Sequence, residues 1–181
     1  MVYDGNLEGR TVRLTPVTEE DAPFILEMRQ NDEITRFFPR LDITVEEQAA
    51  WIRTQREREG DYYFLIRSRD GRRLGTVSVY DIEGDSAEIG RLASLGNSVE
   101  NVEAYLLAYR FAFETLGLAQ LIGRVRPENK KVKSLDERMG FVFDPQLVND
   151  RGFDVVFGKV TRERHAQCAI KMWRLIEKAS E

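Results

Sequence analysis

Strands are marked along this chain by the alternation of apolar with polar residues, or by short apolar runs between turn-forming residues. Residues 9–15 alternate in this way, and the pattern ends at Pro16. In the centre of the chain, three apolar runs are separated by the sequences RDG and EGD, which are typical of tight turns. The predicted strands are residues 9–15, 62–66, 74–80, 86–92, 121–125, 141–143 and 153–160.

Helices are expected where apolar residues recur every three or four positions. A first helix is predicted to end near Gln30, and Thr44 with Glu47 predicts a capping box at the start of a second helix that ends before Gly60. A long helix over residues 98–116 is apolar around much of its circumference and should be central. Two more helices are predicted at residues 129–139 and 162–178. This order of elements indicates an α+β sheet with a crossover in the middle.

The length and composition indicate a single folding unit. Its 181 residues are 42% hydrophobic and 32% charged, which is typical of a single globular domain over residues 1–181. No apolar run approaches the roughly 20 residues of a membrane-spanning helix, and the first residues lack the basic and apolar regions of a secretory signal. We therefore expect a cytoplasmic protein without membrane contact.

Few residues are suited to metal or nucleophilic chemistry. The chain has one cysteine, Cys168, and one histidine, His165, so an internal disulfide and a Cys/His zinc cluster are excluded. The carboxylates show no spacing typical of a metal site, and no metal is expected. The net charge of −4 argues against a nucleic-acid partner, because neutralising phosphates requires a basic surface.

Several stretches of the sequence, taken in order, carry a likeness to a known family. They are residues 13–21, 74–82, 87–90, 109–118, 129–132 and 139–141. The set resembles the GNAT superfamily of acyl-CoA-dependent N-acyltransferases, in particular the branch of ribosomal-protein N-terminal and amino-sugar acetyltransferases. The resemblance covers residues 9–160, the core of a single GNAT-like domain, and leaves the helix at 162–178 as an addition.

The resemblance implies a mixed, mostly antiparallel sheet with helices on both faces and a V-shaped splay between two central strands, residues 86–92 and 121–125. In that family the pantetheine arm of acetyl-CoA lies in the splay, and backbone amides before the central helix hold its pyrophosphate. The residues implied to bind acetyl-CoA here are Leu92, Ala93, Gly96, Asn97, Ser98, Asn129 and Lys133.

The expected pyrophosphate loop departs from the family's signature, in which a cation or glutamine is followed by glycines. The matching residues contain neither a cation nor a glycine, and Glu100 and Glu103 would each oppose a phosphate by about 1 kcal/mol. Asn97 and Glu100 instead have the spacing of an ordinary capping box. Positive-φ turns at Gly96 and Asn97 would still present amides. The lysines within residues 130–133 would either meet a phosphate or form a solvated helix face.

Acetyl transfer to an amine needs a group that removes a proton, because a free alkylamine is mostly protonated at neutral pH. Glu88 is the candidate base, and strand alternation would place it on the same face as Leu92 and Ser94; the alternative is a surface glutamate. A backbone amide around Leu92 and Ala93 would hold the oxyanion. Asp136 stands where the family often has a tyrosine that protonates the leaving thiolate. Because aspartate is normally ionised, no general acid is assigned.

Together these features predict an N-acetyltransferase that moves the acetyl group of acetyl-CoA to a primary amine. The acceptor would be an amino-sugar nucleotide or a protein N-terminus, with a polyamine as a further candidate, and residues 29–39 would select it. The alternative is a GNAT-shaped binding or regulatory module that no longer holds the cofactor. Trp173 and Ile176 would either pack onto their own chain or form the seam of a homodimer.

Overall fold

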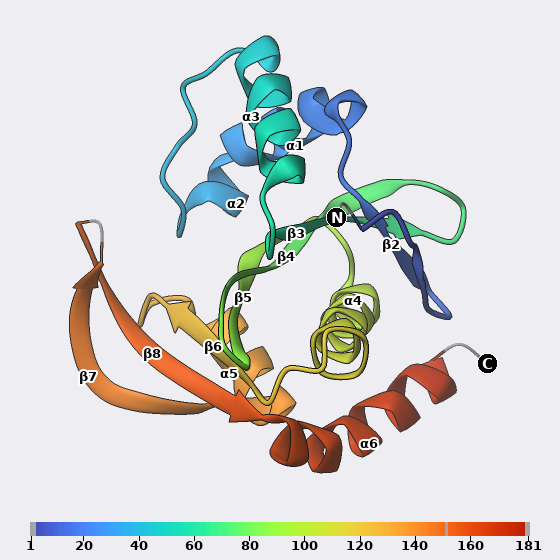
Figure 1. The fold of residues 1–181 in the computed structure, drawn as a ribbon, viewed down its shortest axis with the longest axis vertical. Helices are drawn as coiled ribbons and strands as arrows, with labels where there is room; N and C mark the ends of the chain where they lie inside the picture. Colours follow the sequence, from blue (N-terminus) through green and yellow to red (C-terminus); the bar gives the residue numbers. More distant parts are fainter. Residues whose placement is uncertain (1–2, 151, 180–181) are drawn as a thin grey trace.

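A computed structural model of the protein describes residues 3–150 and 152–179 and shows an eight-stranded sheet with helices on both faces (Figure 1). The strands are β1 Leu7–Glu8, β2 Val12–Pro16, β3 Tyr62–Ser68, β4 Arg73–Glu83, β5 Ser86–Ser94, β6 Gln120–Val125, β7 Val142–Asp150 and β8 Phe153–Thr161. The helices are α1 Ala22–Gln30, α2 Asp32–Thr35, α3 Val45–Glu57, α4 Ser98–Arg110, α5 Lys130–Met139 and α6 Arg162–Ala179. Among these described helices, none combines the length and apolar character needed to cross a membrane.

The strand order is β1-β2-β3-β4-β5-β6-β8-β7, and all neighbouring strands are antiparallel except β5 and β6. Figure 1 shows α1, α2 and α3 on one face of the sheet, and α4 and α6 on the other. The α+β class and the mostly antiparallel sheet expected from the sequence are therefore confirmed.

Some elements differ from the sequence prediction. The two-residue β1 and the four-residue α2 are too short to show a period, and the prediction lacks both. The long helix changes at Arg110 into a π-type turn, Phe111–Thr115. β7 extends beyond the predicted residues, because Pro145 falls in a register shift between Phe143 and Leu147 on an edge strand, where its missing amide costs little.

Buried apolar side chains form a core on each face of the sheet. On one face, α4 is buried from Ala104 to Tyr109, and α6 covers it. Trp173 and Ile176 of α6 belong to this core, so both pack onto their own chain. On the other face, Ile25 of α1 and Ile52 of α3 pack against β3.

The central strands β5 and β6 pair briefly and then separate. Their parallel pairs are Ser86 with Gln120, Ala87 with Leu121, and Glu88 with Ile122. On its other side, β5 takes three residues to advance from Gly90 to Ala93 while β4 takes two. The extra residue is a β-bulge at Arg91, whose φ is 50°. Because a bulge bends its strand, β5 turns away from β6, and this produces the V-shaped splay.

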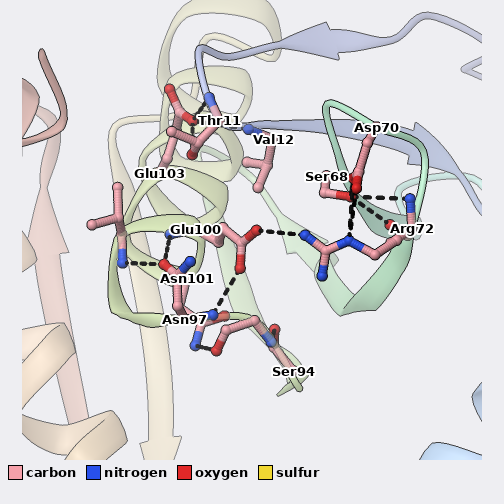
Figure 2. Close-up of polar contacts among 12 residues, drawn as sticks. Thr11, Val12, Ser68, Asp70, Arg72, Ser94, Asn97, Glu100, Asn101 and Glu103 are labelled. Carbon is pink, nitrogen blue, oxygen red and sulfur yellow. Dashed lines mark hydrogen bonds and ion pairs between the residues drawn. The ribbon is translucent and has the colours of Figure 1, made fainter. Parts of the chain in front are cut away.

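Glu103 on α4 ties the central helix to the first turn of the sheet (Figure 2). Its carboxylate is fully buried and accepts hydrogen bonds from the amides of Arg10, Thr11 and Val12 at 2.7, 2.6 and 3.0 Å. The Thr11 hydroxyl donates a fourth bond at 2.5 Å. Because these donors lie in the turn between β1 and β2 and at the first residue of β2, Glu103 holds the edge of the sheet against the helix.

We expect Glu103→Gln to lower the free energy of unfolding by about 2 kcal/mol, because an NH2 group would replace an oxygen that faces N–H donors. Urea unfolding followed by circular dichroism measures this loss. Glu27→Gln, a change at an exposed glutamate of α1, is the control and should alter stability by less than about 0.5 kcal/mol. Equal stability of the two variants would contradict the role given to Glu103.

Candidate functional site

A cleft of about 990 Å³ opens beside the end of β5. Its walls come from β5 and the turn after it, the first turns of α4, one side of α5, and α2 with the chain that follows. The lining residues are 33, 34, 37, 38, 92–98, 101, 102, 129–132, 134, 135 and 138. This volume lies at the upper end of the range of pockets that bind drug-sized organic ligands.

Most of the residues expected to bind acetyl-CoA lie at this cleft. Those that line it are Leu92, Ala93, Gly96, Asn97, Ser98 and Asn129. Lys133 is not brought to the cleft: its ammonium pairs with Glu137 at 3.0 Å and lies 5.5 Å from the ring centre of Phe143. Helical spacing places Arg138 on the stripe of Lys131, seven residues earlier. Arg138 lines the cleft, and the sequence reasoning missed it although this spacing could have indicated it.

The start of α4 is capped by its own side chains (Figure 2). The Asn97 side-chain oxygen accepts hydrogen bonds from the amides of Val99 and Glu100 at 2.9 and 3.0 Å. The Glu100 carboxylate accepts the amide of Asn97 at 2.8 Å, and the Ser94 hydroxyl accepts that of Gly96 at 3.0 Å. The predicted capping box is confirmed. The expected positive-φ turns are wrong: Asn97 has a φ of −72°, and Gly96 is not among the described residues with positive φ.

The two acids of α4 do not face the cleft. Glu103 turns toward the β1–β2 turn, and Glu100 lies between its cap and Arg72, whose Nη2 is 3.6 Å from the carboxylate (Figure 2). Neither residue is part of the cleft lining. Backbone amides compensate the charge of Glu103, so the expected repulsion of a phosphate is reduced there. The Glu100 carboxylate remains within the cap, beside the Arg72 guanidinium, and its repulsion of a phosphate stays a prediction.

Glu88 lies in a hydrogen-bonded network across four strands, β4, β5, β6 and β7. Its carboxylate accepts bonds from the Tyr80 hydroxyl and from Nε and Nη2 of Arg124, the Nε bond being 3.0 Å long. Nη1 of Arg124 also donates to Asp150 at 2.9 Å. The hydrogen bonds to Glu88 raise the pKa of the Arg124 guanidinium. Glu88 is therefore an engaged carboxylate, with 13% of its side chain exposed, and it does not line the cleft.

The bulge at Arg91 changes which residues share a face with Glu88. Glu88 pairs with Tyr80, and Ala93 pairs with Thr76 on the same face of β4. Leu92 packs into the core on the opposite face. The expectation that Glu88 shares the face of Leu92 and Ser94 is therefore wrong, because the inserted residue reverses the alternation.

A family model described as an acetyltransferase (GNAT) domain matches residues 11–142. The chain belongs to this family. As a GNAT acetyltransferase, it is an acyl-CoA-dependent N-acyltransferase. No curated protein matches the chain significantly.

Solved structures of GNAT enzymes share the fold of this acetyltransferase. Apo FdhC, described as a nucleotide-linked sugar GNAT, is 28% identical with a TM-score of 0.83, over 96% of this chain and 99% of that one. Spermidine N-acetyltransferase from Vibrio cholerae, in complex with CoA and spermine, is 20% identical with a TM-score of 0.75, over 87% and 99%. RimJ from Mycobacterium smegmatis, in complex with CoA-disulfide, is 17% identical with a TM-score of 0.77, over 95% and 96%. The last two likenesses show the shared fold alone.

Arg91 of this GNAT enzyme is held on the face of the sheet covered by α3. Its guanidinium pairs with Asp61 through bonds of 2.6 and 3.1 Å and lies 4.1 Å from the ring centre of Tyr80. Burial lowers the pKa of Arg91, but the pair with Asp61 outweighs it and raises the pKa on balance. These side-chain contacts hold Arg91 in the positive-φ conformation of the bulge.

Asp136 is a buried carboxyl group between α5 and α4. It is 3% exposed and lies near Tyr105 and Tyr109. Burial raises the pKa of Asp136 to about 7, although the Tyr105 hydroxyl opposes the shift. The expectation of an ordinary ionised aspartate is therefore wrong, because the group is partly protonated at neutral pH. Asp136 does not line the cleft.

The raised pKa of Asp136 predicts a loss of stability with rising pH. The folded protein keeps this proton up to about pH 7, whereas an unfolded aspartate releases it near pH 3.9, so folding is favoured less as the pH rises through this window. We expect the free energy of unfolding of Asp136→Asn to fall less between pH 5 and pH 8 than that of the wild type, by on the order of 2 kcal/mol.

Urea unfolding at pH 5, 6, 7 and 8 measures this difference. Asp42→Asn, at an exposed aspartate, is the control and should retain the wild-type pH dependence. If Asp136→Asn also retains it, the Asp136 carboxyl does not titrate as described.

Proposed function

We propose that this enzyme transfers the acetyl group of acetyl-CoA to the primary amine of an amino-sugar nucleotide. The observation that carries the proposal is the cleft at the splay, whose walls combine the end of β5 with aromatic residues after α2. The likeness to FdhC supports this acceptor over a protein N-terminus or a polyamine, because it has the higher identity and spans nearly both chains.

The cleft fits the two parts of acetyl-CoA in different ways. Leu92, Val102, Val132 and Leu135 provide apolar wall for the pantetheine arm. Cationic side chains of α5 line the cleft as well and suit phosphate groups.

Aromatic rings line the acceptor end of the cleft, and two guanidinium groups outside the lining lie against these rings. Phe37 and Phe38 line the cleft and are half-buried. The Arg29 guanidinium carbon lies 4.9 Å from the ring centre of Phe38, and that of Arg36 lies 5.5 Å from the ring centre of Phe37. Nε of Arg29 is buried without a hydrogen-bond partner among the described residues. Rings that stack on a base and cations that bind a diphosphate suit a nucleotide-linked acceptor.

In the proposed reaction, the acceptor nitrogen attacks the thioester carbonyl, a C–N bond forms, and the C–S bond breaks. A backbone amide at Leu92 and Ala93 stabilises the oxyanion. The nitrogen loses a proton to Glu88, whose carboxylate has about four acceptor positions and uses three of them for Tyr80 and Arg124. The thiolate leaves unaided or takes its proton from water.

A screen of amine acceptors with labelled acetyl-CoA tests the proposed function. Amino-sugar nucleotides, the corresponding free amino sugars, peptides with free N-termini and polyamines are compared by kcat/KM. Preference for the nucleotide-linked amine over the free amino sugar supports the acceptor class. Preference for a peptide or a polyamine contradicts it, and binding of acetyl-CoA without transfer to any of them favours the binding module.

We expect Glu88→Gln to lower kcat by about 100-fold or more while the KM for acetyl-CoA changes by less than about 3-fold, because the amide cannot accept the proton. Steady-state kinetics with the best acceptor measures both constants. Asp150→Asn is the matched control, since it removes the charge from the other contact to Arg124 and leaves the Glu88 carboxylate in place. A loss below about 3-fold for Glu88→Gln, or an equal loss in the control, would remove Glu88 as the base.

A further inference from the structure

Three cations line the cleft from α5: Lys130, Lys131 and Arg138. Within residues 3–150 and 152–179, none of them makes an ion pair or a side-chain hydrogen bond. Glu33 is the one acidic side chain among the described residues of the cleft lining. A chain with a net charge of −4 therefore presents a positive surface at this cleft, which attracts anionic groups.

The start of α4 is the other candidate for binding a phosphate, and four of its amides are engaged. The amides of Gly96, Asn97, Val99 and Glu100 all donate to side chains of the same turn. A phosphate at this place would have to displace the Asn97 side chain and would meet the Glu100 carboxylate. Breaking a satisfied cap and approaching a like charge both oppose binding there.

We propose that the phosphates of acetyl-CoA are held by side-chain cations of α5, and that the amides of α4 remain in their cap. This inference rests on the proposed use of acetyl-CoA. Lys130 and Lys131 hold the diphosphate at the start of α5. Arg138 lies seven residues after Lys131, which is about 10 Å along the helix, and holds the 3′-phosphate.

Isothermal titration of the full chain with CoA, dephospho-CoA and pantetheine tests each assignment. The double variant Lys130→Ala/Lys131→Ala is expected to bind CoA and dephospho-CoA about 10-fold more weakly, because both carry the diphosphate. Arg138→Ala is expected to bind CoA about 3- to 10-fold more weakly but to keep its affinity for dephospho-CoA. Both variants should bind pantetheine as the wild type does. Unchanged CoA affinity in the double variant, or equal losses for CoA and dephospho-CoA in Arg138→Ala, would overturn the assignment concerned.

Two further variants separate the proposal from its alternatives. Lys133→Ala removes the same charge from the same helix outside the cleft and should change CoA affinity by less than about 2-fold. Asn97→Ala releases the amides of Val99 and Glu100, so tighter CoA binding in this variant would show that α4 holds the phosphates. Circular dichroism confirms that each variant is folded.

The inference and the proposed function fail in different ways. A wild-type chain that binds neither CoA nor pantetheine would overturn the use of acetyl-CoA itself. If the wild type binds CoA and the α5 variants bind it equally tightly, only the role given to the cations is overturned.

Discussion

The ion pair between Arg91 and Asp61 is the interaction on which the geometry of the cleft depends. A residue other than glycine at positive φ costs roughly 1 kcal/mol, and the pair with Asp61 and the contact with Tyr80 offset this cost. The conformation inserts one residue into β5 and bends the strand away from β6. If β5 continued straight, the two strands would go on pairing and the cleft would have no opening at the sheet.

The same bulge separates the proposed base from the apolar wall of the cleft. Before it, Glu88 and Tyr80 face the side of the sheet that carries the Arg91 pair. After it, Leu92 belongs to the core on the side of α4. On the proposed assignment of Glu88, the acceptor and the thioester would approach from opposite faces of the sheet and meet where β5 bends.

Much of this structure follows from local patterns in the sequence. The features that the sequence could not predict depend on contacts between segments that are distant along the chain. The cap of Asn97 with Glu100 is predictable because its partners are three residues apart. The role of Glu103 is not, because its donors at residues 10–12 lie about ninety positions away. The bulge was not predicted either. A glycine at position 91 would have suggested a positive φ, but an arginine does not.

The acids at the start of α4 and the cations of α5 complement each other. Glu100 and Glu103 are satisfied within the protein, so the positive end of α4 is already compensated and has little left to offer a phosphate. Because these acids turn away from the cleft, they do not pair with Lys130, Lys131 or Arg138, and the three cations stay available to a ligand. On the proposed assignment, a turn that lacks the family's cation and glycine signature is compatible with coenzyme binding because the neighbouring helix α5 carries the charge.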